Sequence, residues 1–327
     1  MLATTTHNPS PTTGARSAGL ATTTHNPSPT TRALTALRAL LQEPPPPLAF
    51  ELSEAGVAVA RIGARTELDF RPLKPGVLAI SPLKDNVLIP DDLSFAVREL
   101  APQNGSRKRR GAALILPDYS TRIAVLDFDN FPSDPKEQLS LVRFRLRKSI
   151  PFDVESAAMS YSVLPPEGKK FDVVVAVAPL EVVSRYEAPF RAAGLNPGLV
   201  IPSALAALDL IDSGGVTVVA KISGHALTVM VLQRGRLKLV RCLEIAGTDI
   251  PEIAADLYPT FVYIEDNLGA QADRLLLCGF GEHTAPAREQ FKNELRVEVQ
   301  PVRSPLSLAG PHNAGLLGYL RSLGRDA

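Results

Sequence analysis

The sequence contains few of the residues that carry metal or redox chemistry. Its 327 residues include no tryptophan, three methionines, five histidines and two cysteines, Cys242 and Cys278. Both cysteines lie inside apolar, strand-like runs, and two distant thiols supply too few ligands for a zinc site. The pattern indicates buried thiols in a reducing compartment and predicts no metal centre.

Two further absences limit where the protein acts. Lysine plus arginine (35) nearly balance aspartate plus glutamate (34), so the net charge of +1 creates no general attraction to nucleic acid or to an acidic membrane. No apolar run approaches the roughly 18 residues that span a bilayer, and the N-terminus lacks the basic and then apolar order of a signal peptide. We therefore expect a cytoplasmic protein with no membrane span of its own and no nucleic-acid partner.

The short motifs of common enzymes are also missing. The chain has no GxSxG, HExxH, GxxxxGK[ST] or CxxC spacing. It therefore lacks common sequence signatures of hydrolases, zinc proteases, P-loop proteins and thiol redox proteins. The basic run in GSRKRRG (105–111) has no interleaved aromatic residues and is typical of a solvated loop. The acidic pair in DFDNF (127–131) lacks the spacing of a calcium loop. Motifs alone therefore predict no catalytic residue.

The chain begins with a repeated polar tail. LATTTHNPSPTT occupies residues 2–13 and again residues 20–31, and its composition predicts disorder. Residues 31–42 place leucines on one helical face, and the following EPPPP ends that helix in an extended spacer. We assign residues 1–47 to a disordered tail with a short helix, which packs on the body or docks on a membrane protein.

Strand and helix patterns alternate in blocks from residue 48 onward. Three-strand meanders open near PLAFELSEAGVAVARI (47–62) and again over residues 216–244. Between them, Asp134 and Pro135 have the types expected at the start of a capped helix. Two halves, each with three strands, a crossover helix and further strands, suggest an actin-like α/β fold, although a general α/β chain gives a similar pattern.

Three stretches identify a family resemblance. RFRLRKSIPFDVESAAMSYSVL (143–164), the segment with the AGLNP corner (171–208) and the closing NAGLLGYLRS (313–322) resemble the type IV pilus assembly protein PilM family. That family is related to the bacterial cell-division protein FtsA. The resemblance covers roughly residues 48–327 and is most specific over 143–208.

The resemblance implies a domain layout and a setting. It implies an actin-like ATPase fold of two ribonuclease H-like halves, with a first half at 48–118, an inserted subdomain at 119–194 and a second half at 195–327. Family members sit on the cytoplasmic face of the inner membrane. There they bind the cytoplasmic tail of PilN, a single-span protein, in a groove of the first domain and the insert. They also link to the motor and platform of the pilus, and their fold binds ATP between its halves.

The first phosphate hairpin of such a fold departs from the family pattern. Phosphate and metal binding need an Asp, a Gly and small hydroxyl residues in each of two facing turns. Here Glu51 replaces the Asp, Ser53 replaces the Gly, and Glu54 lies among the small polar positions. A carboxylate at Glu54 would face the phosphates and repel them.

The second hairpin departs further. In KISGHALT, Lys221 replaces the metal-site Asp and Ser223 replaces the Gly, while Gly224, His225 and Thr228 remain. Lys221 and His225 could hold an anion directly, but we expect an exposed, solvated strand-end lysine and turn histidine.

The elements that grip the nucleoside are reduced. No AExxK helix pattern is present between the second hairpin and the last buried strand, and the interval is short, so we expect a reduced second domain. Of the double-glycine turn expected beneath the adenine, Gly279 and Gly281 in CGFGEH are present. Glycine at these positions also suits an ordinary strand-to-helix turn. We therefore predict a degenerate nucleotide site with no bound cofactor, although the family permits Mg-ATP.

These observations predict a non-catalytic scaffold in a type IV pilus or related secretion machine, with a PilN-like tail and the motor or platform components as partners. An ATP-binding ATPase of the same machine is one alternative. A cytoplasmic platform domain of a type II secretion system is another. We expect the partner surface on the insert, at Arg143, Phe144, Arg145, Ile150, Pro151 and Phe152.

Overall fold

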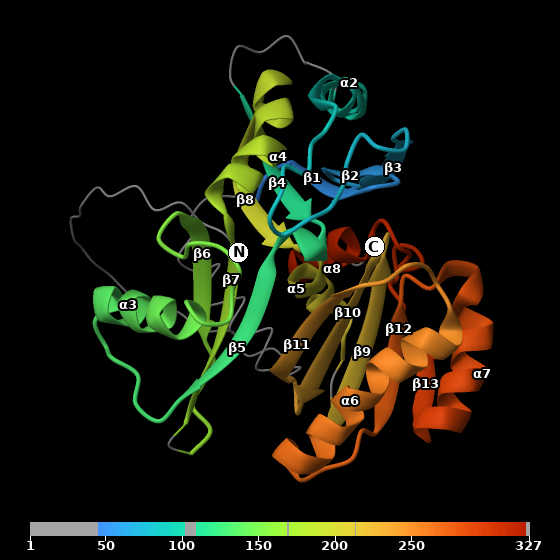
Figure 1. Ribbon diagram of the computed structural model, residues 1–327. Helices are drawn as coiled ribbons and strands as arrows, with labels where there is room; N and C mark the ends of the chain where they lie inside the picture. The colour runs from blue at the N-terminus through green and yellow to red at the C-terminus, as the bar shows by residue number, and fades with distance from the viewer. Residues whose placement is uncertain (1–44, 102–108, 169, 213, 325–327) are drawn as a thin grey trace, which may run out of the picture.

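The computed structural model describes residues 45–101, 109–168, 170–212 and 214–324. The predicted tail helix at 31–42 lies outside these ranges. Within them, three sheets make up the molecule: two with five strands and one with three. Figure 1 shows the first sheet at the top, the three-stranded sheet at the lower left and the second large sheet at the lower right.

The first half is a mixed sheet in the order β3-β2-β1-β4-β8. Its first three strands form an antiparallel meander, while β4 and β8 run parallel to β1. Their bounds are β1 (Leu48–Ser53), β2 (Gly56–Ile62), β3 (Thr66–Pro72), β4 (Arg110–Leu116) and β8 (Leu195–Pro202). Helices α2 (Pro90–Leu100) and α4 (Leu180–Ala192) pack on one face, where their apolar sides join the strands in one core. Gly194 follows the end of α4 and has a φ of +78°, as is common for a glycine at the end of a helix.

The insert is a three-stranded antiparallel sheet with one helix. Its order is β5-β7-β6, from β5 (Arg122–Phe128), β6 (Ala157–Val163) and β7 (Phe171–Pro179). Helix α3 (Pro135–Leu146) covers one face through its buried Val142 and Leu146. The predicted cap is confirmed, because Asp134 accepts hydrogen bonds from the backbone N–H groups of Lys136 and Glu137.

The second half repeats the plan of the first. Its sheet has the order β11-β10-β9-β12-β13, from β9 (Val216–Ser223), β10 (Ala226–Gln233), β11 (Arg236–Glu244), β12 (Arg274–Cys278) and β13 (Glu298–Pro301). A tight turn joins β10 to β11, and its residues Arg234 and Gly235 both have positive φ. One helix, α6 (Ile250–Leu268), joins β11 to β12, and with α7 (Thr284–Leu295) it covers one face of the sheet.

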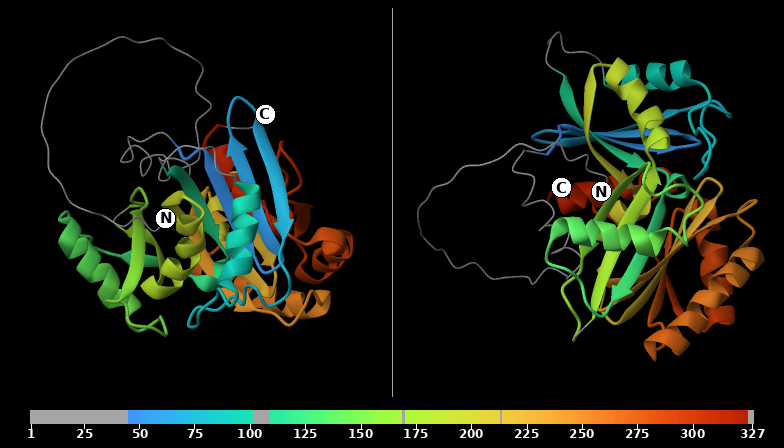
Figure 2. Two further views of the ribbon diagram at one scale, coloured as in Figure 1. Left: turned by 90° about the horizontal axis from the view of Figure 1, so that it is seen from above. Right: turned by 60° about the vertical axis from the view of Figure 1, so that its left-hand side comes forward.

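A shared core lies between the two large sheets. The short helix α5 (Ser203–Ala207), the turn η2 (Leu208–Leu210) and the last helix α8 (Ala314–Ser322) fill it, together with residues from both sheets. In both views of Figure 2, α8 lies near the middle of the molecule. The α5–α8 contact is close, because a Cβ on Gly318 would lie 2.1 Å from the carbonyl oxygen of Ala206.

The structure places the boundary of the first half differently from the sequence prediction. We predicted that the insert would extend to residue 194 and that the second half would begin at 195. Helix α4 instead buries Tyr186 and Phe190 in the core of the first sheet, and β8 pairs with β4. The chain therefore leaves the first half after β4, forms the insert, and returns through α4 to a parallel strand, as a crossover connection requires.

Candidate functional site

The two predicted hairpin turns face each other across the junction of the halves. Glu54, in the β1–β2 turn, lies with Oε2 3.0 Å from Nδ1 of His225 in the β9–β10 turn. Its other oxygen accepts a hydrogen bond of 3.3 Å from the backbone N–H of Ile80. Gly224 lies close to the same carboxylate, since a Cβ on Gly224 would be 2.7 Å from Oε2 of Glu54. The Glu54 carboxylate is therefore already engaged across the cleft.

Lys221 lies behind these turns and is buried. Its Nζ donates a hydrogen bond of 2.8 Å to Oδ2 of Asp118, and the two side chains are 2% and 1% exposed. The expectation of a solvated strand-end lysine is therefore wrong. Strand β9 is the central strand of its sheet. The Lys221 side chain near its end therefore points toward the first half and not into water.

Asp118 is the acceptor at the centre of this arrangement. It opens the one-turn helix η1 (Asp118–Ser120), just after β4. Besides Lys221, Oδ2 accepts a hydrogen bond of 3.1 Å from the Thr228 hydroxyl, and Oδ1 accepts one of 2.6 Å from the backbone N–H of Ala204. The aspartate belongs to the first half and Lys221 to the second, so the ion pair joins the halves.

Glu51 is also buried, and it is bound to a helix start. It accepts hydrogen bonds from the Ser203 hydroxyl at 2.5 Å and from the N–H groups of Gly315 (3.3 Å) and Leu316 (2.7 Å) in the first turn of α8. A carboxylate is favoured there, since the N-terminus of a helix carries partial positive charge. The side chain that replaces the metal-binding Asp thus binds protein groups.

The charged groups of this cluster shift one another's pKa values. Burial by itself lowers the pKa of Lys221, but Asp118 and Glu51 outweigh it and raise that pKa above its usual value, so the lysine remains charged. Burial raises the pKa of Glu51, opposed by Lys221 and by the hydrogen bonds from Ser203 and Leu316. The carboxyl groups of Asp118 and Glu51 therefore favour the charged form of Lys221.

A loop before α8 covers the rest of the junction. The Ser223 hydroxyl donates to the carbonyl oxygen of Pro311 at 3.0 Å. The Ser53 hydroxyl lies 3.4 Å from Nδ1 of His312, whose ring stacks on Phe70. Both serines that replace the hairpin glycines therefore contact this loop.

The two glycines after β12 have different surroundings. Gly279 has a φ of +78°, and its Cβ would lie 2.1 Å from the carbonyl oxygen of Ile222, so only glycine fits this approach to the second hairpin. Gly281 begins the turn η3 (Gly281–His283) before α7, with open space where a Cβ would be. The structure thus brings Gly279, but not Gly281, into close contact with the hairpin.

Little space remains between the hairpins. The cavity there has a volume of about 50 Å³ and is lined by residues that include Ser53, Glu54, Asp118, Ser223 and His225. Ligand pockets for small molecules and cofactors usually have volumes of roughly 300–1,000 Å³. Across the described ranges, no group of three or more His, Cys, Asp or Glu side chains could hold a metal ion.

Sequence reasoning missed four residues of this cluster: Asp118, Ser203, Thr228 as a ligand of Asp118, and His312. One signal was present for Asp118, because it lies two residues after the buried strand β4, at the edge where parallel strands present their carboxyl ends. No local signal could have paired it with Lys221, which lies 103 positions further along the chain.

The predicted partner residues all lie on the insert but differ in exposure. Phe144 is 64% exposed on α3, and Pro151 is also exposed. Ile150 and Phe152 pack against the core of the insert instead.

The two predicted arginines are held by neighbours. Arg143 pairs with Glu155 at 3.2 Å, and Arg145 lies 3.6 Å from Asp127 with its guanidinium 5.3 Å from the Phe128 ring centre. The exposed, unengaged part of the predicted surface is therefore apolar.

Comparison with known proteins agrees with this architecture. No protein-family model and no curated protein matches the chain. A solved PilM-PilN type IV pilus biogenesis complex matches with a TM-score of 0.70 and 21% identity, over 84% of this chain and 98% of that one. A Bacteroides thetaiotaomicron protein of actin-like ATPase fold and unknown function matches at 0.53, with 14% identity over 84% and 95%.

A weaker likeness concerns the second alternative. The cytoplasmic domain of EpsL, from the type II secretion system of Vibrio cholerae, gives a TM-score of 0.42 with 17% identity over 70% of this chain and 80% of that one. That value is too low to bear on function. In the part of the chain that the structure describes, no helix has the length and hydropathy needed to cross a membrane.

The fold prediction is confirmed. The chain has an actin-like ATPase fold, with two related halves, an inserted subdomain and a shared cleft. Among the solved structures compared, it is similar in fold to a chain of the PilM-PilN type IV pilus biogenesis complex.

Proposed function

We propose that this protein is a non-catalytic, actin-like scaffold of a type IV pilus or related secretion machine. The observation that carries the proposal is the buried ion pair between Lys221 and Asp118, at the junction where the fold family binds Mg-ATP. The likeness in fold to the PilM chain of a PilM-PilN complex supports the setting.

The residues at the junction do not fit Mg-ATP. The Lys221 ammonium would repel Mg²⁺, and moving it would leave Asp118 buried without a cation. Glu54 and His225 close the mouth of the cleft, and about 50 Å³ of space remains behind them. A nucleotide would have to separate the halves and break these contacts at the same time.

The scaffold role requires a partner surface, and the insert offers two features for one. Strand β6 is an edge strand, so an extended chain could add to it through backbone hydrogen bonds, with side-chain pockets giving selectivity. Phe144 is a large exposed apolar side chain on the same subdomain. We propose that the extended cytoplasmic tail of a PilN-like, single-span membrane protein binds here, which would hold the protein at the inner membrane.

Calorimetric titration with Mg-ATP tests the first part of the proposal. We expect no heat of binding and no shift in melting temperature that depends on Mg²⁺ at concentrations up to about 1 mM, the range of weak binding. A matched titration of Glu54→Ala, which opens the mouth of the cleft, shows whether that side chain alone is the barrier. Micromolar binding to the unmodified protein that depends on Mg²⁺ would favour the alternative of an ATPase with unusual residues.

A pull-down with the cytoplasmic tail of the neighbouring single-span protein tests the second part. We expect retention at tens of micromolar, roughly the range of weak peptide recognition, and loss of retention in Phe144→Ser. Phe95→Ser is a matched control, since Phe95 is 51% exposed on α2 in the first half. Equal retention of all three proteins would argue against the insert as the partner surface.

A further inference from the structure

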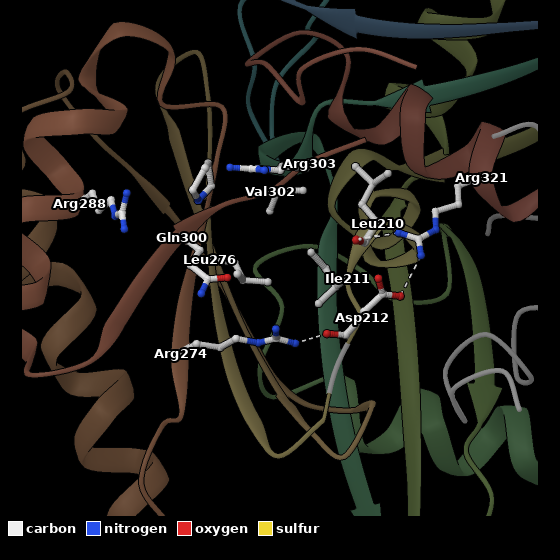
Figure 3. Close-up of a pocket in the computed structure, with 11 residues that line it drawn as sticks. Leu210, Ile211, Asp212, Arg274, Leu276, Arg288, Gln300, Val302, Arg303 and Arg321 are labelled. Carbon is white, nitrogen blue, oxygen red and sulfur yellow. Dashed lines mark hydrogen bonds and ion pairs between the residues drawn. The ribbon is translucent and has the colours of Figure 1, made fainter. Parts of the chain in front are cut away.

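A second cavity lies far from the hairpins, in the second half of the molecule. It has a volume of about 490 Å³, within the range of small-molecule sites. Figure 3 shows that its side chains come from separate elements: η2 and the residues after it, β12, β13, α7 and α8. The cavity therefore exists only in the folded molecule, at the junction of the second sheet with the shared core.

The charges around this cavity are unbalanced. Four arginines line it, Arg274, Arg288, Arg303 and Arg321, with Asp212 as the one acidic residue of the lining. Like charges gathered in one concavity repel each other and raise the local potential. An anion bound between them would remove that repulsion.

Two of the arginines are held in place by neighbouring groups. Arg321 donates to Oδ1 of Asp212 at 2.8 Å and to the carbonyl oxygen of Leu210 at 3.2 Å. Arg274 donates to the carbonyl oxygen of Asp212 and, at 3.2 Å, to the Thr217 hydroxyl. Fixed guanidinium groups lose little side-chain entropy when they bind an anion.

The other two arginines retain capacity for a ligand. Within the described residues, the ion-pair contact of Arg288 is a long one, 3.9 Å to Glu298, which also pairs with Lys292 at 3.2 Å. The Arg288 side chain is 55% exposed. Arg303 has no ion-pair partner within the described part of the chain. In Figure 3 Arg288 lies at the left and Arg303 at the top, while Arg321 and Asp212 lie at the right.

Apolar side chains also line the cavity beside these charges. Leu276 and Val302 line it and are almost fully buried, at 7% and 6% exposure. A mixture of arginines and apolar surface suits a small molecule that carries several anionic groups on an organic body. We propose that this cavity binds a small organic polyanion, whose phosphate or carboxylate groups are held by Arg288, Arg303 and the two anchored arginines.

Titration calorimetry with three probes tests the proposal on the full chain: pyrophosphate, citrate, and ADP in the presence of EDTA. We expect saturable binding of at least one probe below about 1 mM, weakened by added salt. Preference for pyrophosphate or ADP identifies a phosphate ligand, and preference for citrate identifies a carboxylate ligand.

Arginine-to-alanine variants show where the probe binds, and their melting temperatures show whether the protein is still folded. Arg288→Ala and Arg303→Ala should each weaken binding about tenfold, because each removes charge-assisted hydrogen bonds. Both side chains are exposed, so the variants should keep the melting temperature of the free protein. Arg65→Ala, an exposed arginine on the β2–β3 turn, should bind like the unmodified protein.

The outcomes are separate from those for the cleft. Absence of saturable binding for all three probes overturns the proposal, as does equal weakening by Arg65→Ala and Arg303→Ala. ADP binding without Mg²⁺ that is lost in Arg303→Ala but kept in Glu54→Ala supports this cavity and leaves the proposed scaffold function standing. ADP binding that is kept in Arg303→Ala and strengthened in Glu54→Ala places the ligand in the cleft and contradicts both proposals.

Discussion

Lys221 is the residue on which the closed junction depends most. Replacing it by methionine keeps much of the volume but leaves Asp118 buried without its cation. We expect Lys221→Met to lower the free energy of unfolding by about 3–5 kcal/mol, the usual cost of breaking a buried pair. Urea denaturation measures it.

The double variant Lys221→Met with Asp118→Asn is the control for that experiment. It removes both charges and keeps an acceptor for the N–H of Ala204, so it should be more stable than the single variant. A single variant within about 0.5 kcal/mol of the unmodified protein would contradict a structural role for the ion pair.

His312 gives the junction a dependence on pH. Burial lowers the pKa of this ring, and the nearby Lys221 lowers it further. When the pH falls below about 6.5, the unfolded chain takes up a proton before the folded protein does, so stability decreases as the pH falls through this window. His312→Gln should lose less stability than the unmodified protein between about pH 7.5 and 5.5.

Urea denaturation at the two pH values measures this difference. His283→Gln is a suitable control, because His283 lies in the exposed turn η3. If His312→Gln and the unmodified protein lose the same stability, titration of the His312 ring does not contribute.

At the scale of elements, the contact between α5 and α8 leaves no room for a methyl group. A Cβ on Gly318 would lie 2.1 Å from the Ala206 carbonyl oxygen and 2.8 Å from Cα of Ala207. Gly318→Ala must therefore push α8 away, and we expect a loss of about 1–3 kcal/mol in the free energy of unfolding.

Thermal unfolding measures this effect against Gly198→Ala in β8, where an added Cβ meets nothing within 4 Å. An equal change in melting temperature for both variants would mean that helix packing does not limit Gly318.

At the scale of the whole molecule, a network of charges joins the insert to the second half. Lys238 and Arg236 on β11 lie 2.8 Å and 3.3 Å from Oδ2 of Asp172 on β7, and Glu167 contacts both cations. Asp172→Asn should weaken this joint by about 1–3 kcal/mol, as for hydrogen bonds to charged groups. Hydrogen exchange should then increase in β5 and β7 while the first sheet is unchanged.

Glu155→Gln is the matched control for the network. Glu155 pairs with Arg143 and Arg147 within the insert and is 52% exposed. Its loss should change stability by less than about 1 kcal/mol, since exposed ion pairs contribute little. Similar exchange in both variants would argue that the network does not position the insert.

Features that depend on contacts between sequence neighbours were predicted correctly. Features that depend on contacts between distant parts of the chain were not. The helix cap at Asp134 depends on neighbouring residues in the sequence, and it was predicted correctly. Lys221 was misjudged because its environment is set by Asp118 on the other half. The arginine cavity combines side chains from several elements, so no local sequence pattern could predict it.

The position of α8 also matters during synthesis of the protein. Residues 314–322 follow every strand of the described residues, yet they fill the core between both large sheets and supply N–H groups that bind Glu51 on β1. A ribosome-bound chain that lacks this segment has neither half complete, and the apolar surfaces of the central core remain open to water. Folding of the two halves is therefore finished together, only after the segment that contains α8 has left the ribosome.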